Sequence, residues 1–406
     1  MLSFTPSSVA ELHRFMQSEV APQHTAVSPL GGKTALRCGH PLRRQATDLD
    51  LTGLKQVIDY PARDMTITVE AGLRVRELQR TLAEERQRLA VDIPQPGLAT
   101  IGGAIATNAS GSRRFGHGTF RDHLIGITAI DGQGRLFSAG GRVVKNVAGY
   151  DLCKLLIGSL GTLGIVTQVT LKLRPMPEQT QVVWFGFDSS ESVELALQRL
   201  VTTSTRPVAI DVYNPRGAER LALLSERSVP TGQSGVCLVF EGSEAEVRWQ
   251  VQTILEELRA TRPQAEIAWN SVDSSALVSA MTEFASTPEE TFIAQLSVPA
   301  SQVSGTVSQL TLQGLAIQSH AANGIIHGIL PARHSTPDAL PVYWDKLREL
   351  VASVGGNGSL VGGPEQIREN AAVLGNRRGD WSIMSGIRKA LDPYELLNPG
   401  RIRLRP

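Results

Sequence analysis

Hydrophobic and polar positions alternate along several short segments in the first part of the chain. Every second position is apolar in residues 65–69 and again in 169–173, which predicts two half-buried strands. Residues 124–141 predict two further strands joined by a turn at Asp131-Gly132. Between residues 74 and 90 the apolar positions recur at helical spacing instead, so we expect one amphipathic helix there.

A different order of elements begins near residue 180. The patterns predict strand, helix, two strands and helix over residues 182–262, and the same order again over 291–354. Such an order is typical of an antiparallel sheet with helices on one face. The two copies share no sequence identity, so the repetition concerns structure. The whole chain is therefore expected to be α+β.

The length of the chain and the positions of its prolines predict how it is organised into domains. The chain has 406 residues, which favours two domains over one. Two prolines interrupt residues 174–179, so we expect one domain over 1–177 and a second over 178–375. The last segment, 376–406, ends in LDPYELLNPGRIRLRP, which predicts an extended tail that must dock on another part of the chain to be ordered.

Composition narrows the classes of function. The formal net charge is +1, which gives no general attraction to nucleic acid or anionic membranes. No apolar run approaches 18 residues, so we expect no transmembrane segment. The start of the chain lacks the pattern of a secretory signal, and three widely spaced cysteines suit a reducing cytoplasm better than a disulfide framework or an iron–sulfur cluster.

Glycine-rich segments are the strongest chemical signal. Residues 158–164 read GSLGTLG, but an alternating strand pattern follows them, whereas a nicotinamide-binding Rossmann motif would open a helix. The Gly31-Gly32-Lys33-Thr34 loop is either an anion-binding nest or a simple turn. Small residues over 102–111 offer either a surface for a flat ring system or close backbone packing. Three such patches in one domain favour nucleotide binding.

In this order the motifs resemble a known family. The series runs from GGKT (31–34) through PGLATIGGAIATNASGSRRFGHGTFRDHLIGI (96–127) and KNVAGYDLCKLLIGSLGTLGIVTQVTLKL (145–173) to NPGRI (398–402). It is similar to the FAD-binding domain of the vanillyl-alcohol oxidase and p-cresol methylhydroxylase (PCMH-type) flavoproteins. More narrowly, residues 140–166 resemble the E subunits of bacterial glycolate oxidases (glycolate dehydrogenases).

The resemblance implies a fold, a cofactor and a set of binding residues. The fold would be a two-subdomain FAD-binding domain, an antiparallel cap domain and a C-terminal tail that returns to the FAD-binding domain. FAD would be bound without a covalent link. The residues implied to bind it are Leu30, Gly31, Gly32, Lys33 and Thr34 at the pyrophosphate; Pro96, Gly97, Thr100, Ile101, Gly102 and Gly103 at the isoalloxazine ring; Asn108, Gly111 and Gly118 along the flavin; Gly161, Gly164, Ile165 and Val166 near the adenine and phosphates; and Asn398 from the tail.

The chain also departs from the catalytic relatives that oxidise D-2-hydroxy acids. Those relatives carry the run G-S-E-G-T-L-G. They also carry H-A-G-D-G-N-x-H and E-H-G, and these two motifs supply metal ligands and a proton-accepting histidine. Here Leu160 replaces the glutamate. The segment HAANGIIH keeps both histidines, His320 and His327, but Asn323 replaces the acid and Ile325 replaces the second polar residue. Glu365 is the nearest equivalent of the last motif, without its histidine. His320, His327 and Glu365 are therefore weak catalytic candidates. The two histidines are either metal ligands or polar residues on a sheet face, and we expect no metal.

Three functions remain open at this point. The first is the FAD-binding subunit of a complex that oxidises a 2-hydroxy acid, either glycolate or D-lactate. In that complex a second flavoprotein subunit would bind and oxidise the acid, and an iron–sulfur subunit would receive the electrons. Such a complex would be cytoplasmic or peripheral to the membrane through its partners. The second is a self-sufficient D-2-hydroxy-acid dehydrogenase, and the third is a scaffold without catalysis.

Four further residues have two interpretations each. Arg113 and Arg121 are either carboxylate clamps or surface arginines. Tyr150 and Asp151 are either structural or directed at the flavin.

Overall fold

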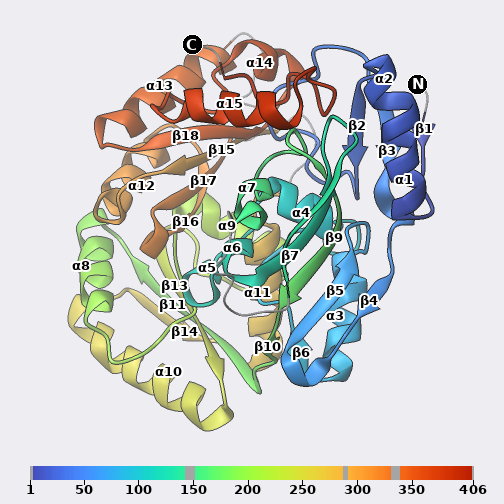
Figure 1. Cartoon of the computed structure of the whole chain (residues 1–406). Coiled ribbons are helices and arrows are strands. Elements are labelled where there is room, and N and C mark those ends of the chain that lie inside the picture. Colours follow the sequence, from blue (N-terminus) through green and yellow to red (C-terminus); the bar gives the residue numbers. More distant parts are fainter. Residues whose placement is uncertain (1–2, 142–150, 287–290, 331–338, 405–406) are drawn as a thin grey trace. The chain divides into compact units, whose positions relative to one another are not determined.

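The computed structural model describes residues 3–141, 151–286, 291–330 and 339–404. The chain forms two compact units (Figure 1). Unit 1 contains residues 1–110, 118–176 and 377–406, and unit 2 contains residues 111–117 and 177–376. The chain thus enters unit 2 briefly at Gly111, returns to unit 1 at Gly118, and passes to unit 2 again at Pro177, inside the proline-containing segment 174–179.

Unit 1 is built on two main sheets. Strands β1 (Ser3–Phe4), β3 (Thr47–Asp50) and β2 (Val27–Leu30) form a parallel sheet in the order β1-β3-β2. An antiparallel sheet has the order β4-β5-β9-β7-β8. Its strands are β4 (Val57–Asp59), β5 (Thr66–Glu70), β7 (Leu124–Ile130), β8 (Leu136–Gly140) and β9 (Ile165–Lys172). A short pair, β6 (Gln87–Arg88) and β10 (Arg174–Pro175), completes the strands described in this unit. Two sheets with separate hydrophobic cores agree with the expected two subdomains.

Short helices surround these sheets. They are α1 (Val9–Phe15) with the π-helical turn Met16–Val20, α2 (Ala21–Gln23), α3 (Val75–Glu84), α4 (Ile101–Thr107), α6 (Phe120–His123), α7 (Leu152–Leu156) and α15 (Trp381–Leu391), with single turns at 51–53 and 62–64. The helix predicted over 74–90 is too long. Arg86 has a φ of 54°, in the left-handed region, so the chain leaves the helix after Glu84 and forms β6.

The C-terminal tail docks within unit 1, as expected. The Asp392 carboxylate accepts hydrogen bonds from the N–H groups of Leu396 and Leu397, both at 2.8 Å, and so fixes the turn that ends α15. The next residues continue beside β2, where Val27 N–H donates to the Leu396 carbonyl at 2.8 Å. The tail therefore returns to the loop that follows β2.

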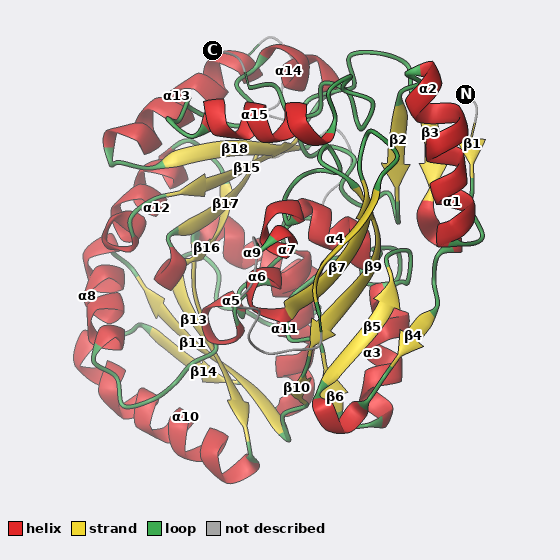
Figure 2. Cartoon of the chain, in the orientation of Figure 1, coloured by secondary structure: helices red, strands yellow, loops and turns green. Residues whose placement is uncertain are grey.

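Unit 2 contains one antiparallel sheet in the order β14-β11-β13-β12-β16-β17-β15-β18 (Figure 2). The strands are β11 (Gln179–Phe187), β12 (Ala209–Tyr213), β13 (Ser234–Gly242), β14 (Ala265–Ala268), β15 (Phe292–Ser297), β16 (Ala316–His320), β17 (Ile325–Leu330) and β18 (Asn357–Gly362). The order in the second half is the mirror of the order in the first half. The predicted repeat is thus confirmed, and β12 and β16 pair at its centre.

Helices cover both faces of this sheet. Helices α8 (Ser190–Val201), α10 (Glu244–Leu258), α12 (Val303–Leu312) and α13 (Leu340–Ser353) pack in one hydrophobic core. Helices α9 (Pro215–Ser225) and α11 (Ser271–Glu283) pack in a second core. The expectation of helices on one face is wrong in this detail, because the central strands are buried on both sides and need cover on both.

The remaining elements of unit 2 are short. They are α5 (Arg114–His117), α14 (Glu365–Asn370) and the single turns at 259–261, 300–302 and 321–323. Over the part of the chain that the structure describes, no helix is long and apolar enough to cross a lipid bilayer.

Candidate functional site

A cleft in unit 1 is bordered by the loop after β2, helix α4, the loop before β9 and the C-terminal tail. It encloses about 830 Å³, including space open to solvent, which is in the size range of cofactor sites. The lining residues are Pro29, Leu30, Gly31, Gly32, Lys33, Thr34, Ala35, Leu36, Cys38, Leu51, Ala71, Thr100, Gly102, Gly103, Ala106, Thr107, Leu160, Gly161, Gly164, Ile165, Val166, Asn398 and Arg401.

The loop after β2 presents its backbone to this cleft. Gly32 packs so tightly that a Cβ atom there would lie 1.8 Å from the Leu98 carbonyl oxygen. Lys33 has a φ of 58°, in the left-handed region. Within the described residues, the N–H groups of Gly31, Gly32, Lys33 and Thr34 donate to no protein acceptor. Adjacent free N–H groups on a glycine-rich loop form a suitable site for an anion such as a pyrophosphate.

Helix α4 supplies a wall of small residues. Thr100 caps the helix, and its Oγ1 accepts a hydrogen bond from the Gly103 N–H at 3.3 Å. Gly102 packs against Ala71, where a Cβ atom would approach the Ala71 Cβ to 2.7 Å. Together with Ala106, these residues leave space along the cleft for a flat or extended ligand.

Asn398 joins three segments of the cleft wall. Its Oδ1 accepts from the Ser28 hydroxyl at 2.9 Å, and its Nδ2 donates to the Leu160 carbonyl at 2.9 Å. Its φ of 45° is one that asparagine tolerates better than most residues. Asn398 thus fixes the tail against β2 and against the loop that precedes β9.

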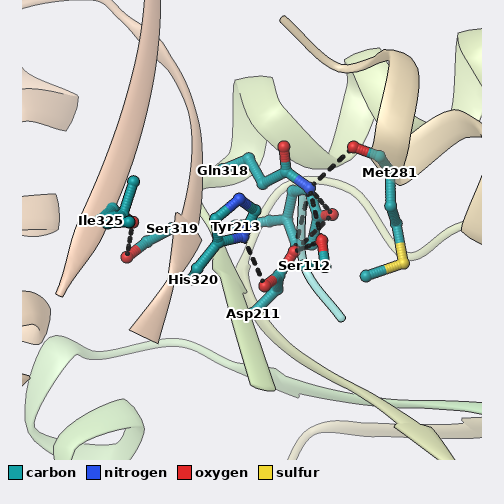
Figure 3. A network of polar contacts seen from close by, with 8 residues as sticks. All are labelled: Ser112, Asp211, Tyr213, Met281, Gln318, Ser319, His320 and Ile325. Atoms are coloured by element: carbon teal, nitrogen blue, oxygen red, sulfur yellow. Dashed lines mark hydrogen bonds and ion pairs between the residues drawn. The ribbon is translucent and has the colours of Figure 1, made fainter. Parts of the chain in front are cut away.

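A second polar cluster lies in unit 2, at the centre of the sheet (Figure 3). Asp211 on β12 and His320 on β16 are direct cross-strand partners, and Asp211 Oδ1 lies 2.9 Å from His320 Nδ1. Ser112, Tyr213 and Gln318 contact the other carboxylate oxygen, Oδ2. The Asp211 and His320 side chains are only 0% and 3% exposed. Burial and the nearby Asp211 charge raise the pKa of the Tyr213 hydroxyl well above its usual value.

His327 on β17 adjoins this cluster. Its ring centroid lies 5.2 Å from that of His320, at an interplanar angle of 63°. Its Nδ1 is buried and has no hydrogen-bond partner in the part of the chain that the structure describes. Burial, then His320 and Arg114, lower the pKa of His327 to about 3, so the ring is neutral near pH 7. A group of such low basicity is a poor proton acceptor.

Family models match both parts of the chain. A model described as an FAD binding domain matches residues 2–140, and one described as the C-terminal domain of FAD linked oxidases matches residues 176–402. The second match alone covers more than half of the chain.

This chain belongs to the FAD-linked oxidases.

Individual proteins show the same relationship. The D-2-hydroxyglutarate dehydrogenase of Xanthomonas citri pv. viticola (strain LMG 965) is 26% identical in an alignment of 422 positions that covers 98% of this chain and 88% of that protein. The glycolate oxidase subunit GlcE of Escherichia coli (strain K12) is 34% identical over 148 residues, 36% of this chain and 42% of that protein. A solved structure of alkyldihydroxyacetonephosphate synthase has the same fold, with a TM-score of 0.66, 18% identity, and coverage of 98% of this chain and 76% of that chain.

FAD is the cofactor of this oxidoreductase, and the cleft in unit 1 fits it. The N–H groups at residues 31–34, which have no acceptor among the described residues, suit an anion such as a pyrophosphate, and the small residues of α4 leave room for the rest of such a molecule. The resemblance to PCMH-type flavoproteins is therefore confirmed in family, fold and cofactor.

The structure brings most of the implied FAD-binding residues of this FAD-linked oxidase together. Thirteen line the cleft: Leu30, Gly31, Gly32, Lys33, Thr34, Thr100, Gly102, Gly103, Gly161, Gly164, Ile165, Val166 and Asn398. Their individual roles toward FAD stay predictions.

Six implied residues lie elsewhere. Ile101 is fully buried in the core. Gly97 packs against the Arg76 guanidinium. The carbonyl of Pro96 accepts a hydrogen bond from the backbone N–H of Arg76. Asn108 ends α4 with a φ of 52°, and Gly118 packs on the Asp122 carboxylate. Gly111 belongs to unit 2.

Sequence reasoning missed other lining residues, including Leu36, Cys38, Ala71, Thr107 and Arg401. Arg401 follows the NPG motif, and its Nη1 donates to the Leu36 carbonyl at 2.7 Å. The tail motif was therefore the available signal for it. Ala71 has no comparable signal, because it enters the cleft only through its packing against Gly102.

The weaker candidates also have definite positions. Arg113 bonds to Glu241 at 2.7 Å, so its guanidinium is engaged in an internal ion pair. Arg121 is exposed, and Glu365 begins α14 with an exposed side chain. Asp151 caps α7 and pairs with Lys154, whereas Tyr150 lies outside the described residues. Within the described ranges, no group of three or more His, Cys, Asp or Glu side chains could hold a metal ion.

Proposed function

We propose that this chain is the FAD-binding subunit of a complex that oxidises a small 2-hydroxy acid, with glycolate as the first acid to test. The observation that carries this proposal is the glycine-lined cleft whose free N–H groups suit the FAD pyrophosphate. Relatives named as a D-2-hydroxyglutarate dehydrogenase and a glycolate oxidase subunit support a 2-hydroxy acid as the substrate class. Bound FAD supplies the two-electron acceptor for such an oxidation.

The residues of unit 2 support a division of labour between subunits. Oxidation of a 2-hydroxy acid requires removal of a hydride from the α-carbon and of a proton from the hydroxyl group. Leu160, Asn323 and Ile325 replace polar residues of the catalytic relatives, and Glu365 has no histidine beside it. We therefore propose that a second flavoprotein subunit contacts the acid and that the FAD of this chain relays electrons.

The cysteines support a separate iron–sulfur partner. A cluster usually needs about four cysteine ligands. This chain has three, and Cys153 and Cys237 are buried in the cores of different units. The electrons would therefore leave to a cysteine-rich subunit.

One observation favours a second function, a self-sufficient dehydrogenase. The buried Asp211–His320 pair is an arrangement that proton-transfer enzymes use, and the match to the dehydrogenase of Xanthomonas citri spans 98% of the chain. In that case His320 would accept the hydroxyl proton, and no partner would be needed for flavin reduction.

An anaerobic absorption spectrum distinguishes these functions. The purified chain is reconstituted with FAD, and its flavin absorbance is recorded before and after addition of glycolate, D-lactate and D-2-hydroxyglutarate. Bound flavin that stays oxidised, but is reduced once copurifying subunits are added, supports the relay subunit. Reduction of the isolated chain supports the self-sufficient enzyme and contradicts the relay. Failure to bind FAD contradicts both and favours the scaffold.

A further inference from the structure

The Asp211 carboxylate occupies the centre of the unit 2 sheet, where its two halves meet. β12 and β16 pair through Asp211–His320, Val212–Ser319 and Tyr213–Gln318. The contact between Asp211 Oδ1 and His320 Nδ1 therefore joins the two repeats directly, at a site from which water is excluded. An unpaired carboxylate would be very unfavourable here, so its hydrogen bonds determine its orientation.

Three donors hold the second oxygen, Oδ2. The Ser112 hydroxyl donates at 2.6 Å, the Gln318 amide at 2.9 Å, and the Tyr213 hydroxyl at 3.3 Å. Gln318 is fixed in turn, because its Nε2 also lies 2.9 Å from the Tyr213 hydroxyl and 3.1 Å from the Met281 carbonyl (Figure 3). The carboxylate cannot rotate without breaking this set, so Oδ1 stays directed at His320.

This geometry selects one form of the His320 ring. An ionised carboxylate only accepts hydrogen bonds, so His320 must carry its proton on Nδ1. When the ring holds a single proton, its lone pair lies on Nε2, and that atom has no partner among the described residues. His327, on the neighbouring strand, has no carboxylate on its Nδ1, so nothing comparable fixes its tautomer.

We propose that Asp211 is a positioning residue that holds His320 in the Nδ1–H tautomer and makes Nε2 a proton acceptor on the unit 2 sheet. The Nδ1–H tautomer of His320 does not depend on the proposed function. In the second proposed function, this chain itself binds the 2-hydroxy acid. The role of His320 Nε2 as acceptor of the hydroxyl proton of that acid rests on this function. The substrate O–H bond would break and an N–H bond would form at His320 Nε2. The electron pair would stay on the oxygen and form the C=O bond as the α-carbon loses its hydride, for which bound FAD supplies the two-electron acceptor.

The ring nitrogen signals of His320 test the positioning role without any activity. The FAD-loaded chain is labelled with ¹⁵N-histidine, and the His320 signals are assigned by their loss in His320→Gln. We expect a protonated Nδ1 and an unprotonated Nε2. Asp211→Ala and the isosteric Asp211→Asn should disturb this pattern, whereas Asp273→Asn, which changes a partly exposed carboxylate of the same unit, should preserve it. A wild-type ring protonated on Nε2 overturns the proposal even if both Asp211 variants fail to fold.

Kinetics test the use of that tautomer separately. In the second proposed function, where glycolate reduces the FAD of the isolated chain, Asp211→Asn should lower kcat by roughly 10²–10⁴-fold and change KM little, because it removes the alignment of a base. If Asp211→Asn lowers kcat by this factor while His320 keeps the Nδ1–H tautomer, Asp211 does not act by positioning His320. Absence of flavin reduction in every assembly would contradict the proposed function and leave the tautomer result standing.

Discussion

Asn398 and Leu160 are 238 positions apart in the sequence, yet the Asn398 amide donates to the Leu160 carbonyl at 2.9 Å. The same side chain accepts from Ser28, so one residue of the tail connects β2 with the loop that precedes β9. Order in the cleft therefore depends on a segment near the end of the chain.

Removal of the Asn398 side chain should weaken FAD binding. Asn398→Gly keeps a backbone that tolerates the φ of 45° but leaves buried partners unsatisfied, a loss of about 1–3 kcal/mol. We expect the dissociation constant for FAD, measured by quenching of flavin fluorescence, to rise about tenfold or more. Asn370→Gly, at an exposed position in unit 2, is the control. Equal effects of the two variants would contradict the role of the tail.

Gly32 should be intolerant of any side chain. In Gly32→Ala the new Cβ atom would lie 1.8 Å from the Leu98 carbonyl oxygen, so the loop must move away from α4 and its N–H groups must shift. We expect purified Gly32→Ala to retain little FAD, measured as the ratio of flavin to protein absorbance.

Gly386→Ala provides the matched control for that substitution. It adds a methyl group in helix α15 of the same unit, where the new Cβ meets no atom within 4 Å apart from its chain neighbours and the backbone of its own helix. It should keep its FAD and gain about 0.5–1 kcal/mol of stability. Full FAD content in Gly32→Ala would show that the loop does not hold the cofactor.

The cleft could be predicted from the sequence to a large extent, because its residues are constrained locally. Gly31, Gly32 and Gly161 belong to short motifs in which close approach or a positive φ excludes other residues. The strand after GSLGTLG was also predictable from its alternation, and it forms β9. The topology of unit 2 followed from the repeated order of elements.

The polar cluster of unit 2 could not be predicted in this way. Asp211 interrupts the apolar run VAIDVY, and its partners Ser112 and His320 are 99 and 109 positions away. Arg113 was a candidate clamp only because of the fork geometry of arginine, and its ion pair with Glu241 depends on residues 111–117 folding into unit 2. Helices α9 and α11 were missed because burial of the second sheet face depends on tertiary structure.

Glu241 should matter more for stability than exposed acids of the same unit. Its carboxylate is 3% exposed and contacts both Arg113 and His117 at 2.7 Å, so it anchors the segment 111–117 on β13. Glu241→Gln removes the buried negative charge that contacts the half-buried Arg113, and we expect unfolding in urea to require about 3 kcal/mol less free energy.

The control for Glu241 is an exposed ion pair. Glu244→Gln breaks the contact with Arg248, whose side chain is 66% exposed, and such pairs contribute at most about 1 kcal/mol. Similar losses in the two variants would show that the buried pair does not anchor the segment.

His327 should make folding sensitive to acid. Burial, His320 and Arg114 lower its pKa to about 3, from an ordinary value of 6.5. Between these two pH values the unfolded chain binds a proton that the folded chain does not, so the free energy of unfolding decreases as the pH falls through this window. Above about pH 7 both states are neutral, and the residue contributes no pH dependence.

Replacement of His327 by asparagine should remove this contribution. His327→Asn cannot bind the proton in either state, so it should lose less stability than the wild type when the pH falls from about 7 to about 5. The difference in slope cannot exceed about 1.4 kcal/mol per pH unit, the value for one proton. Urea unfolding at several pH values measures it, and the slopes are compared because the substitution also changes packing at every pH. Parallel slopes would mean that His327 binds its proton equally well in the folded and the unfolded chain.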